Sequence, residues 1–190
     1  GVVKTSLGIW ALGPMVTRFV PGGYRPQHAG EATSERVRRA VEGLGDTIDG
    51  YEFHYPQELS EENLDEVREV GKQLGGTIND IYCVATGLHL DPMFGRGGLC
   101  SPDRDVRGEA QRRTVAAADF AGQIGAHFIV WPGIEGYNYP FQTPYQDSWA
   151  WLVEGVGMAA EKCREHGVLL FLEHKNSEPA MKILMRNVGM

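Results

Sequence analysis

The sequence predicts an α/β fold built on a parallel sheet, because strand-like apolar segments alternate with helical patterns along the chain. Five segments have the length and composition of buried strands. These are residues 7–10, 50–54, 81–86, 127–131 and 168–173. Between them lie loops and stretches with the apolar spacing of a helix. Such a repeat indicates right-handed crossovers between parallel strands.

Local signals place three of the helices. Ser60 suits the start of a helix, and Leu59 and Leu64 are spaced as a hydrophobic staple around it. A second helix is predicted over roughly residues 105–124, where small and apolar residues recur at helical spacing. A third helix follows the fourth strand and is expected to end before Gly167, since glycine favours helix termination.

A doubly wound open sheet and a (β/α)8 barrel both fit this pattern. No glycine-rich loop of the G-x-G-x-x-G or Walker form follows any strand, which weakens a nucleotide-binding interpretation. Polar and aromatic residues instead stand at the ends of several strands, as on the active-site face of a barrel. They are Trp10, His54, His89, Trp131, Glu173 and Lys175. The long loops at 13–32, 87–102 and 132–144 also favour the barrel.

A complete (β/α)8 barrel usually needs about 250 residues. This sequence has 190 residues and supplies five strands. We therefore expect residues 1–190 to be the amino-terminal part of a single barrel domain, truncated or incompletely determined after its fifth strand. As an open sheet it would leave the edges of the two outer strands unpaired.

Composition excludes several classes of protein. A hydrophobic fraction of 42% can form one core, and a net charge of -7 without a basic run directs the chain neither to nucleic acid nor to anionic lipid. No apolar stretch approaches the roughly 20 residues that span a membrane. No secretory signal opens the chain, and its three cysteines lack metal-like spacing. A cytoplasmic protein with reduced thiols is predicted.

The fifth strand carries the clearest chemical signal. Its apolar run ends at Glu173, and Lys175 follows two residues later on the same side of the strand. A carboxylate and an amine side by side at a strand end fit a metal ligand beside an electrophilic catalyst. A salt bridge at the rim is the structural alternative.

Five motifs, in order, resemble those of the xylose isomerase family and its sugar-isomerase relatives among the xylose isomerase-like TIM barrels. They are Gly8-Ile-Trp10-Ala-Leu-Gly13, Phe53-His54, Pro102-Asp-Arg-Asp-Val-Arg107, Trp131-Pro-Gly133-Ile-Glu135-Gly136 and Glu173-His-Lys175-Asn-Ser-Glu178-Pro179. The resemblance runs from about Lys4 to Met190. It implies a partial TIM barrel, with strands 1–5 and their helices.

The resemblance also implies roles for the strand-end residues. His54 would bind the ring oxygen and anomeric hydroxyl of a sugar and assist ring opening. Trp10 and Trp131 would wall the pocket, joined by His89 where the family has an aromatic residue. In the family an aspartate three residues on holds the histidine, whereas this chain has Gln57 there.

Two further residues would carry the reaction. Glu173 would bind a divalent ion, Mg²⁺ or Mn²⁺ with Co²⁺ possible, and Lys175 would stabilise charge on the carbonyl oxygen. Two ions are expected per complete active site, with the remaining ligands beyond Met190. Asp103 and Glu135 are expected to be structural, pairing with arginines or with backbone amides at a helix start.

The function implied is aldose–ketose isomerisation of the D-xylose to D-xylulose type, by a metal-assisted hydride shift, in a homo-oligomer (dimer or tetramer). A related barrel acting on another sugar is the first alternative: an epimerase, a rhamnose-type isomerase or an inosose dehydratase-like lyase. The segment Tyr55-Pro56-Gln57 and His89 favour it. A non-catalytic half-barrel that needs a partner, or a degenerate sugar-binding relative, is the second alternative.

Overall fold

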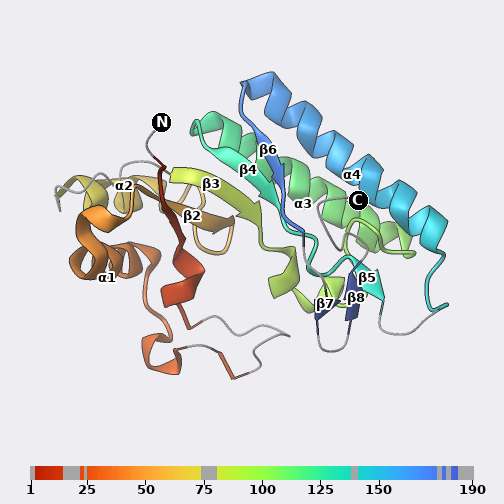
Figure 1. Ribbon diagram of the computed structural model, residues 1–190, viewed down its shortest axis with the longest axis horizontal. Coiled ribbons are helices and arrows are strands. Elements are labelled where there is room, and N and C mark those ends of the chain that lie inside the picture. Colours follow the sequence, from red (N-terminus) through yellow and green to blue (C-terminus); the bar gives the residue numbers. More distant parts are fainter. Residues whose placement is uncertain are drawn as a thin grey trace. The chain divides into compact units, whose positions relative to one another are not determined.

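The computed structural model describes residues 3–14, 22–23, 25–73, 81–137, 141–174, 177–178 and 181–183. The chain divides into two compact units, Gly1–Ala85 and Thr86–Met190. Figure 1 labels the helices and strands of both units.

The first unit contains strands β1 (Ser6–Gly8), β2 (Gly50–Tyr55) and β3 (Ile81–Thr86, which ends at the boundary), adjacent in this order in the sheet. Strands β1 and β2 are parallel, with Ser6 opposite Gly50. The helices of this unit are α1 (Thr33–Leu44) and α2 (Leu64–Gln73), which contact each other. Short 3₁₀ turns occupy Ile9–Leu12, Pro26–His28 and Gly45–Thr47.

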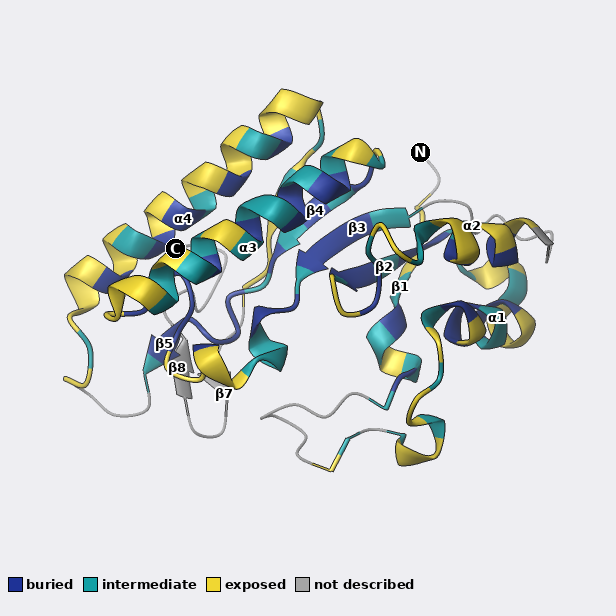
Figure 2. Ribbon diagram, turned by 180° about the vertical axis from the view of Figure 1, so that it is seen from behind, coloured by how far each residue is buried: buried dark blue, intermediate teal, exposed yellow. Residues whose placement is uncertain are grey.

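The core of the first unit lies between the strands and the helices. Tyr51 and Phe53 alternate along β2 and are each 1% exposed. Val37 and Ala40 lie on the buried side of α1, and Figure 2 shows the opposite side of that helix exposed. This amphipathic pattern explains why the segment is helical and packs with one side against the rest of its unit.

The second unit contains the parallel strands β4 (His127–Val130) and β6 (Leu170–Leu172), with Phe128 opposite Leu170. Its helices are α3 (Arg104–Gln123) and α4 (Tyr145–His166), which pack side by side (Figure 1). The guanidinium of Arg107 on α3 lies 4.2 Å from the ring centre of Trp151 on α4. Two 3₁₀ turns, Leu88–Leu90 and Pro92–Phe94, follow β3.

A small antiparallel sheet was not predicted. It consists of β5 (Gly136–Tyr137), β8 (Met181–Ile183) and β7 (Ser177–Glu178), in this order. Gly136 lies opposite Ile183, and Ser177 lies opposite Lys182. Strands of two or three residues are too short for alternation to be recognised in a sequence.

All five predicted strands are confirmed in position. The first is shorter than predicted, because the chain turns into a 3₁₀ helix at Ile9. The fifth covers only Leu170–Leu172 of the predicted 168–173. Parallel pairing in each unit confirms the predicted fold class.

Two of the three helix predictions hold. Asp103 caps α3 by accepting the N–H groups of Asp105 and Val106, which confirms its structural role. Helix α4 ends before Gly167, whose φ of 70° is in the left-handed region. The predicted helix start at Ser60 is wrong, since residues 61–63 form a turn and α2 begins at Leu64. The Ser60 N–H is bound by the Asn63 side chain at 2.9 Å, which stabilises this turn instead.

The three cysteines are free and buried, as expected for reduced thiols. Burial raises the pKa of Cys83 to about 12 and also raises the pKa of Cys163.

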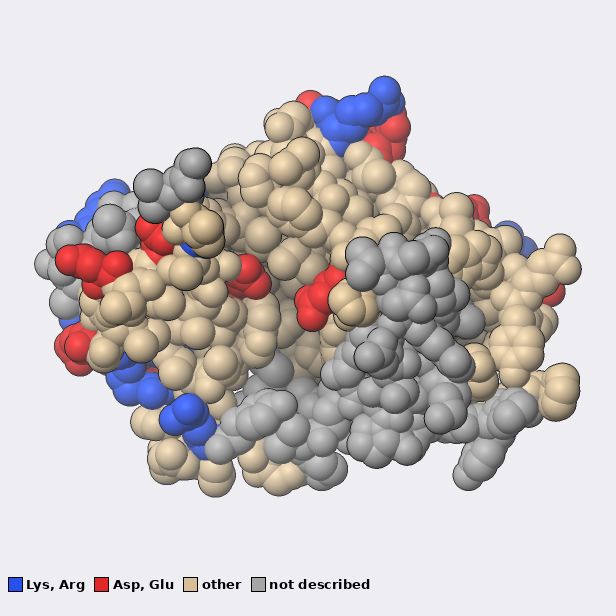
Figure 3. Space-filling view, viewed as in Figure 1, with Lys and Arg blue, Asp and Glu red and all other residues tan. Residues whose placement is uncertain are grey.

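Among the described residues, no helix is long and apolar enough to cross a membrane. Basic and acidic residues follow one another at the end of α4, where Lys162 pairs with Glu165. Figure 3 shows both kinds of charge gathered at its top.

Candidate active site

Trp10 follows β1 and lies on the backbone of Gly8. A Cβ at Gly8 would be 2.2 Å from an atom of the Trp10 ring, so only glycine leaves room for the indole. The ring is therefore fixed by the main chain two residues before it. This explains the spacing of glycine and tryptophan in the first motif.

His54 lies near the end of β2 and is 6% exposed. Its ring centre is 4.4 Å from that of Trp10, with the planes inclined at 42°. The structure thus brings together two predicted site residues from neighbouring strands of the first unit.

A residue that the sequence did not reveal holds His54 in place. The Glu58 carboxylate lies 3.0 Å from His54 Nδ1, and the same oxygen accepts the His54 backbone N–H at 2.8 Å. An ionised carboxylate can only accept, so Nδ1 carries the proton. Glu58 is 4% exposed, whereas Gln57 is exposed.

A tight turn brings Glu58 back to the histidine. The N–H groups of Glu58 and Leu59 both donate to the carbonyl of His54. Compared with an aspartate at position 57, Glu58 stands one residue later and has one more methylene. The only sequence signal was a carboxylate within a turn's length of the histidine.

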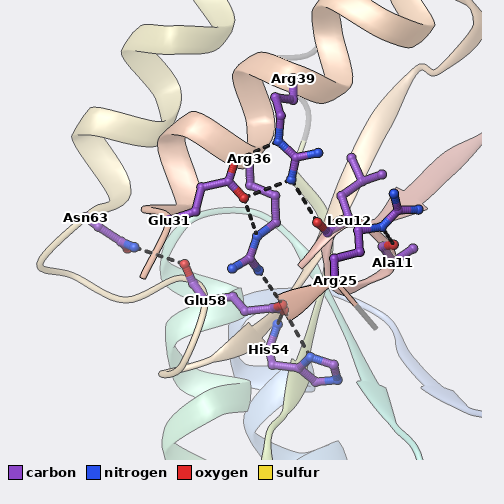
Figure 4. A network of polar contacts seen from close by, with 9 residues as sticks. All are labelled: Ala11, Leu12, Arg25, Glu31, Arg36, Arg39, His54, Glu58 and Asn63. Carbon is purple, nitrogen blue, oxygen red and sulfur yellow. Dashed lines mark hydrogen bonds and ion pairs between the residues drawn. The ribbon is translucent and has the colours of Figure 1, made fainter. Parts of the chain in front are cut away.

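The Glu58 carboxylate is also bound by Arg36 of α1. Arg36 Nη1 donates to Glu58 Oε1 at 3.1 Å, and both side chains are nearly buried (Figure 4). The arginine compensates a carboxylate that would otherwise be costly to bury.

The second unit contains a similar contact between predicted residues. The rings of His89 and Trp131 meet edge to face, with centres 4.9 Å apart and planes at 83°. A Cβ at Gly133 would be 2.1 Å from the Trp131 ring, so this indole also lies on a glycine two residues away. Each unit therefore presents a tryptophan that is fixed by glycine and in contact with a histidine.

Glu173 stands directly after β6, and its N–H donates to the carbonyl of Val130 at 3.1 Å. Its side chain is exposed. Lys175, the predicted partner of Glu173, lies outside the described residues.

No group of three or more His, Cys, Asp or Glu side chains that could hold a metal ion is found in the described part of the chain. Glu173 supplies one hard oxygen donor, which suits Mg²⁺ or Mn²⁺. One carboxylate does not make a metal site, so the described residues alone do not fit a two-ion centre.

Glu135 is structural, as predicted, but its partners lie before the helix rather than at its first residues. Its carboxylate accepts the N–H groups of Gly98, Leu99 and Cys100 at 3.2, 2.8 and 2.8 Å. Glu135 is 2% exposed. Burial and the neighbouring Glu135 raise the pKa of the Cys100 thiol. This carboxylate joins the segment after β4 to the loop that precedes α3.

The second unit also has an open cavity of about 160 Å³. Its lining residues are Gly95, Arg96, Pro102, Gly136, Tyr137, Gln142 and Thr143. None of the predicted site residues that the structure describes is among them. The cavity is smaller than the roughly 300 Å³ at which ligand pockets usually begin.

Parallel strands joined through helices, with aromatic and titratable side chains at the strand ends, define an α/β protein of the barrel class. A family model described as Xylose isomerase-like TIM barrel matches residues 38–181. The chain belongs to this family.

Xylose isomerases are among its curated relatives. The enzyme from Thermus thermophilus is 32% identical over 126 residues, which cover 65% of this chain and 33% of the relative. The xylose isomerase from Thermus caldophilus is 31% identical over the same shares of the two chains.

Solved structures of similar fold include several named as sugar epimerases. A D-tagatose 3-epimerase-like protein matches with a TM-score of 0.65 and 13% identity, over 94% of this chain and 55% of its own. D-Psicose 3-epimerase from Clostridium cellulolyticum H10 matches with a TM-score of 0.60 and 19% identity, over 91% and 53%. The match spans about a third of the curated relatives and just over half of these structures.

Proposed function

We propose that the complete protein interconverts sugars as an isomerase of the aldose–ketose type, with D-xylose to D-xylulose as the first candidate reaction. The observation that carries the proposal is the contact of His54 with both Glu58 and Trp10, near the end of β2. Membership of the family and the identity with xylose isomerases support it.

The histidine and its carboxylate suit the opening of a sugar ring. With Nδ1–H donated to Glu58, Nε2 is the accepting nitrogen of the neutral imidazole. It can take the anomeric hydroxyl proton and return a proton to the ring oxygen. Glu58 supplies the negative charge that stabilises the intermediate imidazolium, a charge that Gln57 lacks.

The tryptophans would shape the pocket. Indole faces favour the apolar C–H surface of a sugar and exclude water from the reacting carbons. Trp10 follows β1 and Trp131 follows β4, and each stands in a motif that resembles one of the family. We therefore assign both rings to the sugar-binding wall, together with His89.

Glu173 would be a ligand of a divalent ion, and Lys175 would donate to the substrate carbonyl oxygen. A bound Mg²⁺ or Mn²⁺, or Co²⁺, would polarise the substrate oxygens. The further ligands for two ions would have to come from residues other than those described.

An epimerase is the second candidate. His89 stands where the resembled family has an aromatic residue, and its half-buried imidazole makes the pocket more polar. The neighbouring turn also differs, with Glu58 rather than an aspartate at 57 on the histidine. A different hydroxyl pattern on the substrate would match these changes.

The experiment compares sugars with the full-length protein in the presence of Mg²⁺, Mn²⁺ or Co²⁺. D-Xylose is followed to D-xylulose, and ketohexoses are followed for inversion at C3, with the His54→Asn variant as control. Conversion of xylose supports the first candidate, and inversion at C3 supports the second. Sugar binding without turnover would indicate a degenerate binding protein and would overturn both.

We further propose a homo-oligomer, a dimer or tetramer, in the cytoplasm. Light scattering coupled to size-exclusion chromatography tests the assembly. A monomer at micromolar concentration would contradict it.

A further inference from the structure

Arg36 connects helix α1 to the candidate catalytic histidine. Its side chain is buried, and Nη1 donates to Glu58 Oε1 at 3.1 Å. Figure 4 shows the guanidinium between the carboxylates of Glu31 and Glu58, with His54 beyond Glu58.

Both oxygens of Glu58 are engaged. Oε2 accepts two hydrogen bonds from His54, one from the backbone and one from the ring. Oε1 accepts the bond from Arg36. The carboxylate therefore cannot rotate about its last bond without breaking one of these contacts. Its orientation sets which ring nitrogen of His54 finds an acceptor.

Gly13 makes room for Arg36. A Cβ at Gly13 would be 2.7 Å from both Cζ and Nη1 of Arg36. The backbone of Gly13 has φ -88° and ψ 166°, which any residue adopts. The need for glycine here is therefore one of space and not of conformation. The last glycine of the first motif thus lies directly against the guanidinium.

Neighbouring arginines hold the segment that carries Trp10. Arg39 binds both oxygens of Glu31 at 2.6 and 2.8 Å and donates to the carbonyl of Leu12 at 2.8 Å. Arg25 donates to the carbonyl of Ala11 at 3.3 Å. Arg25 and Arg39 thus hold the segment after Trp10, and Arg36 holds Glu58.

The pairing of Arg36 is not optimal for stability alone. Its Nε is buried without a hydrogen-bond partner in the described structure, 3.8 Å from Glu31 Oε2. A buried donor without an acceptor costs free energy. The contact with Glu58 is retained despite this cost.

We propose that Arg36 is a positioning residue, which fixes Glu58 so that His54 keeps its proton on Nδ1 and presents Nε2 as the acceptor. Gly13 provides the space for Arg36 to reach Glu58. The catalytic relevance of this arrangement rests on the proposed function, because it assigns ring opening to His54.

The test is the tautomer of His54 in the full-length protein, read from long-range ¹⁵N–¹H correlations of the imidazole nitrogens. The signals of His54 are identified by their loss in His54→Asn. The variants are Arg36→Met, Arg36→Lys and Gly13→Ala. Arg38→Met is the matched control, since Arg38 lies on the same helix, is 35% exposed and lies 3.7 Å from Glu35 rather than against Glu58.

Wild type and Arg38→Met should show protonated Nδ1 and unprotonated Nε2. Arg36→Met should show a mixture in which protonated Nε2 appears. Gly13→Ala should shift the mixture the same way, because its methyl group displaces the guanidinium. Arg36→Lys should restore part of the wild-type pattern, since an ammonium can still donate to one oxygen.

A wild-type tautomer in Arg36→Met would overturn the proposal. If Arg36→Met does not fold, an unchanged tautomer in Gly13→Ala would overturn it equally. No sugar enters this measurement, so a failure to convert sugars would refute the proposed function and leave the positioning role standing. An unchanged tautomer in a protein that converts sugars would refute only the positioning role.

Discussion

The carboxylate of Glu135 accepts the backbone N–H of Leu99 at 2.8 Å, although the two residues are 36 positions apart. The N–H groups of Gly98 and Cys100 bind the same carboxylate. We expect Glu135→Gln to lower the free energy of unfolding by about 2–4 kcal/mol, because an amide nitrogen would face N–H groups that need an acceptor. Urea denaturation measures this loss.

Glu154→Gln is the control for this prediction, since Glu154 is an exposed residue of α4. Its effect should stay within about 0.5 kcal/mol. Equal midpoints for the two variants would show that Glu135 does not hold the loop.

Two glycine-to-alanine changes should have opposite signs. Gly133→Ala places a methyl group against the Trp131 ring and should destabilise the protein by about 1–3 kcal/mol, with a change in tryptophan fluorescence. Gly157→Ala on α4 meets nothing within 4 Å and should stabilise by about 0.5–1 kcal/mol. Thermal unfolding of both variants compares them, and the same sign for both would contradict the placement of Trp131.

Glu58, and not Gln57, should support turnover. If the proposed function is correct, Glu58→Ala should lower kcat by about 10- to 100-fold, because the imidazole loses its orienting carboxylate. Gln57→Ala should change kcat less than about twofold, a margin well under 1 kcal/mol. Steady-state kinetics on the sugar that the protein converts compare kcat of the two variants with that of the wild type. A larger loss of kcat in Gln57→Ala than in Glu58→Ala would show that Glu58 is not the residue that orients His54.

Glu173 and Lys175 should separate metal binding from chemistry. We predict that Lys175→Met removes most turnover and leaves affinity for Mn²⁺ largely intact. Glu173→Gln should weaken Mn²⁺ binding by about tenfold or more, because it removes a charged ligand. Titration calorimetry with Mn²⁺ measures both variants. Equal loss of affinity in the two would favour a salt bridge between them.

Asp91 should stabilise the protein in a pH-dependent way. Its pKa is held below the ordinary value by the Met93 N–H and by Arg113, which lies 2.8 Å away. A depressed carboxyl pKa stabilises the fold above the pKa of the unfolded chain, and this contribution is lost as pH falls through the folded pKa. Asp91→Asn should therefore cost about 0.5–1 kcal/mol near neutral pH.

The difference between Asp91→Asn and wild type should shrink below about pH 4, where the carboxylate of the unfolded chain is protonated. Urea denaturation at a series of pH values follows it. A constant difference down to pH 2 would show that charge is not its source.

The sequence predicted the strands and most helix ends well, since local chemistry decides them. The apolar run 81–86 is buried at its centre, as its composition indicates, and Gly167 can take the left-handed conformation that ends a helix. The apolar run of the fifth strand is instead partly exposed at Phe171 and Leu172. The start of α2 was wrong because two local signals compete there. Ser60 is a good cap, yet Asn63 binds its N–H and stabilises a turn first.

The contacts within the candidate active site were less predictable. Tryptophan and histidine could be recognised at the strand ends, and Trp10 and His54 do meet. The partner of His54 could not be deduced, because a turn of the backbone decides whether residue 57 or residue 58 faces the ring. Arg36 is 22 positions from Glu58, and no periodicity connects the two.

Because each of the two indoles packs on a glycine, its position is set before any ligand binds. The rings of Trp10 and Trp131 each pack against their own main chain, at Gly8 and Gly133. The conformational entropy of these side chains is therefore lost when the protein folds and need not be lost again on binding. The surface that a sugar would contact is therefore formed before the sugar binds. Selectivity at these two positions should depend on how well the shape of the sugar fits this rigid surface.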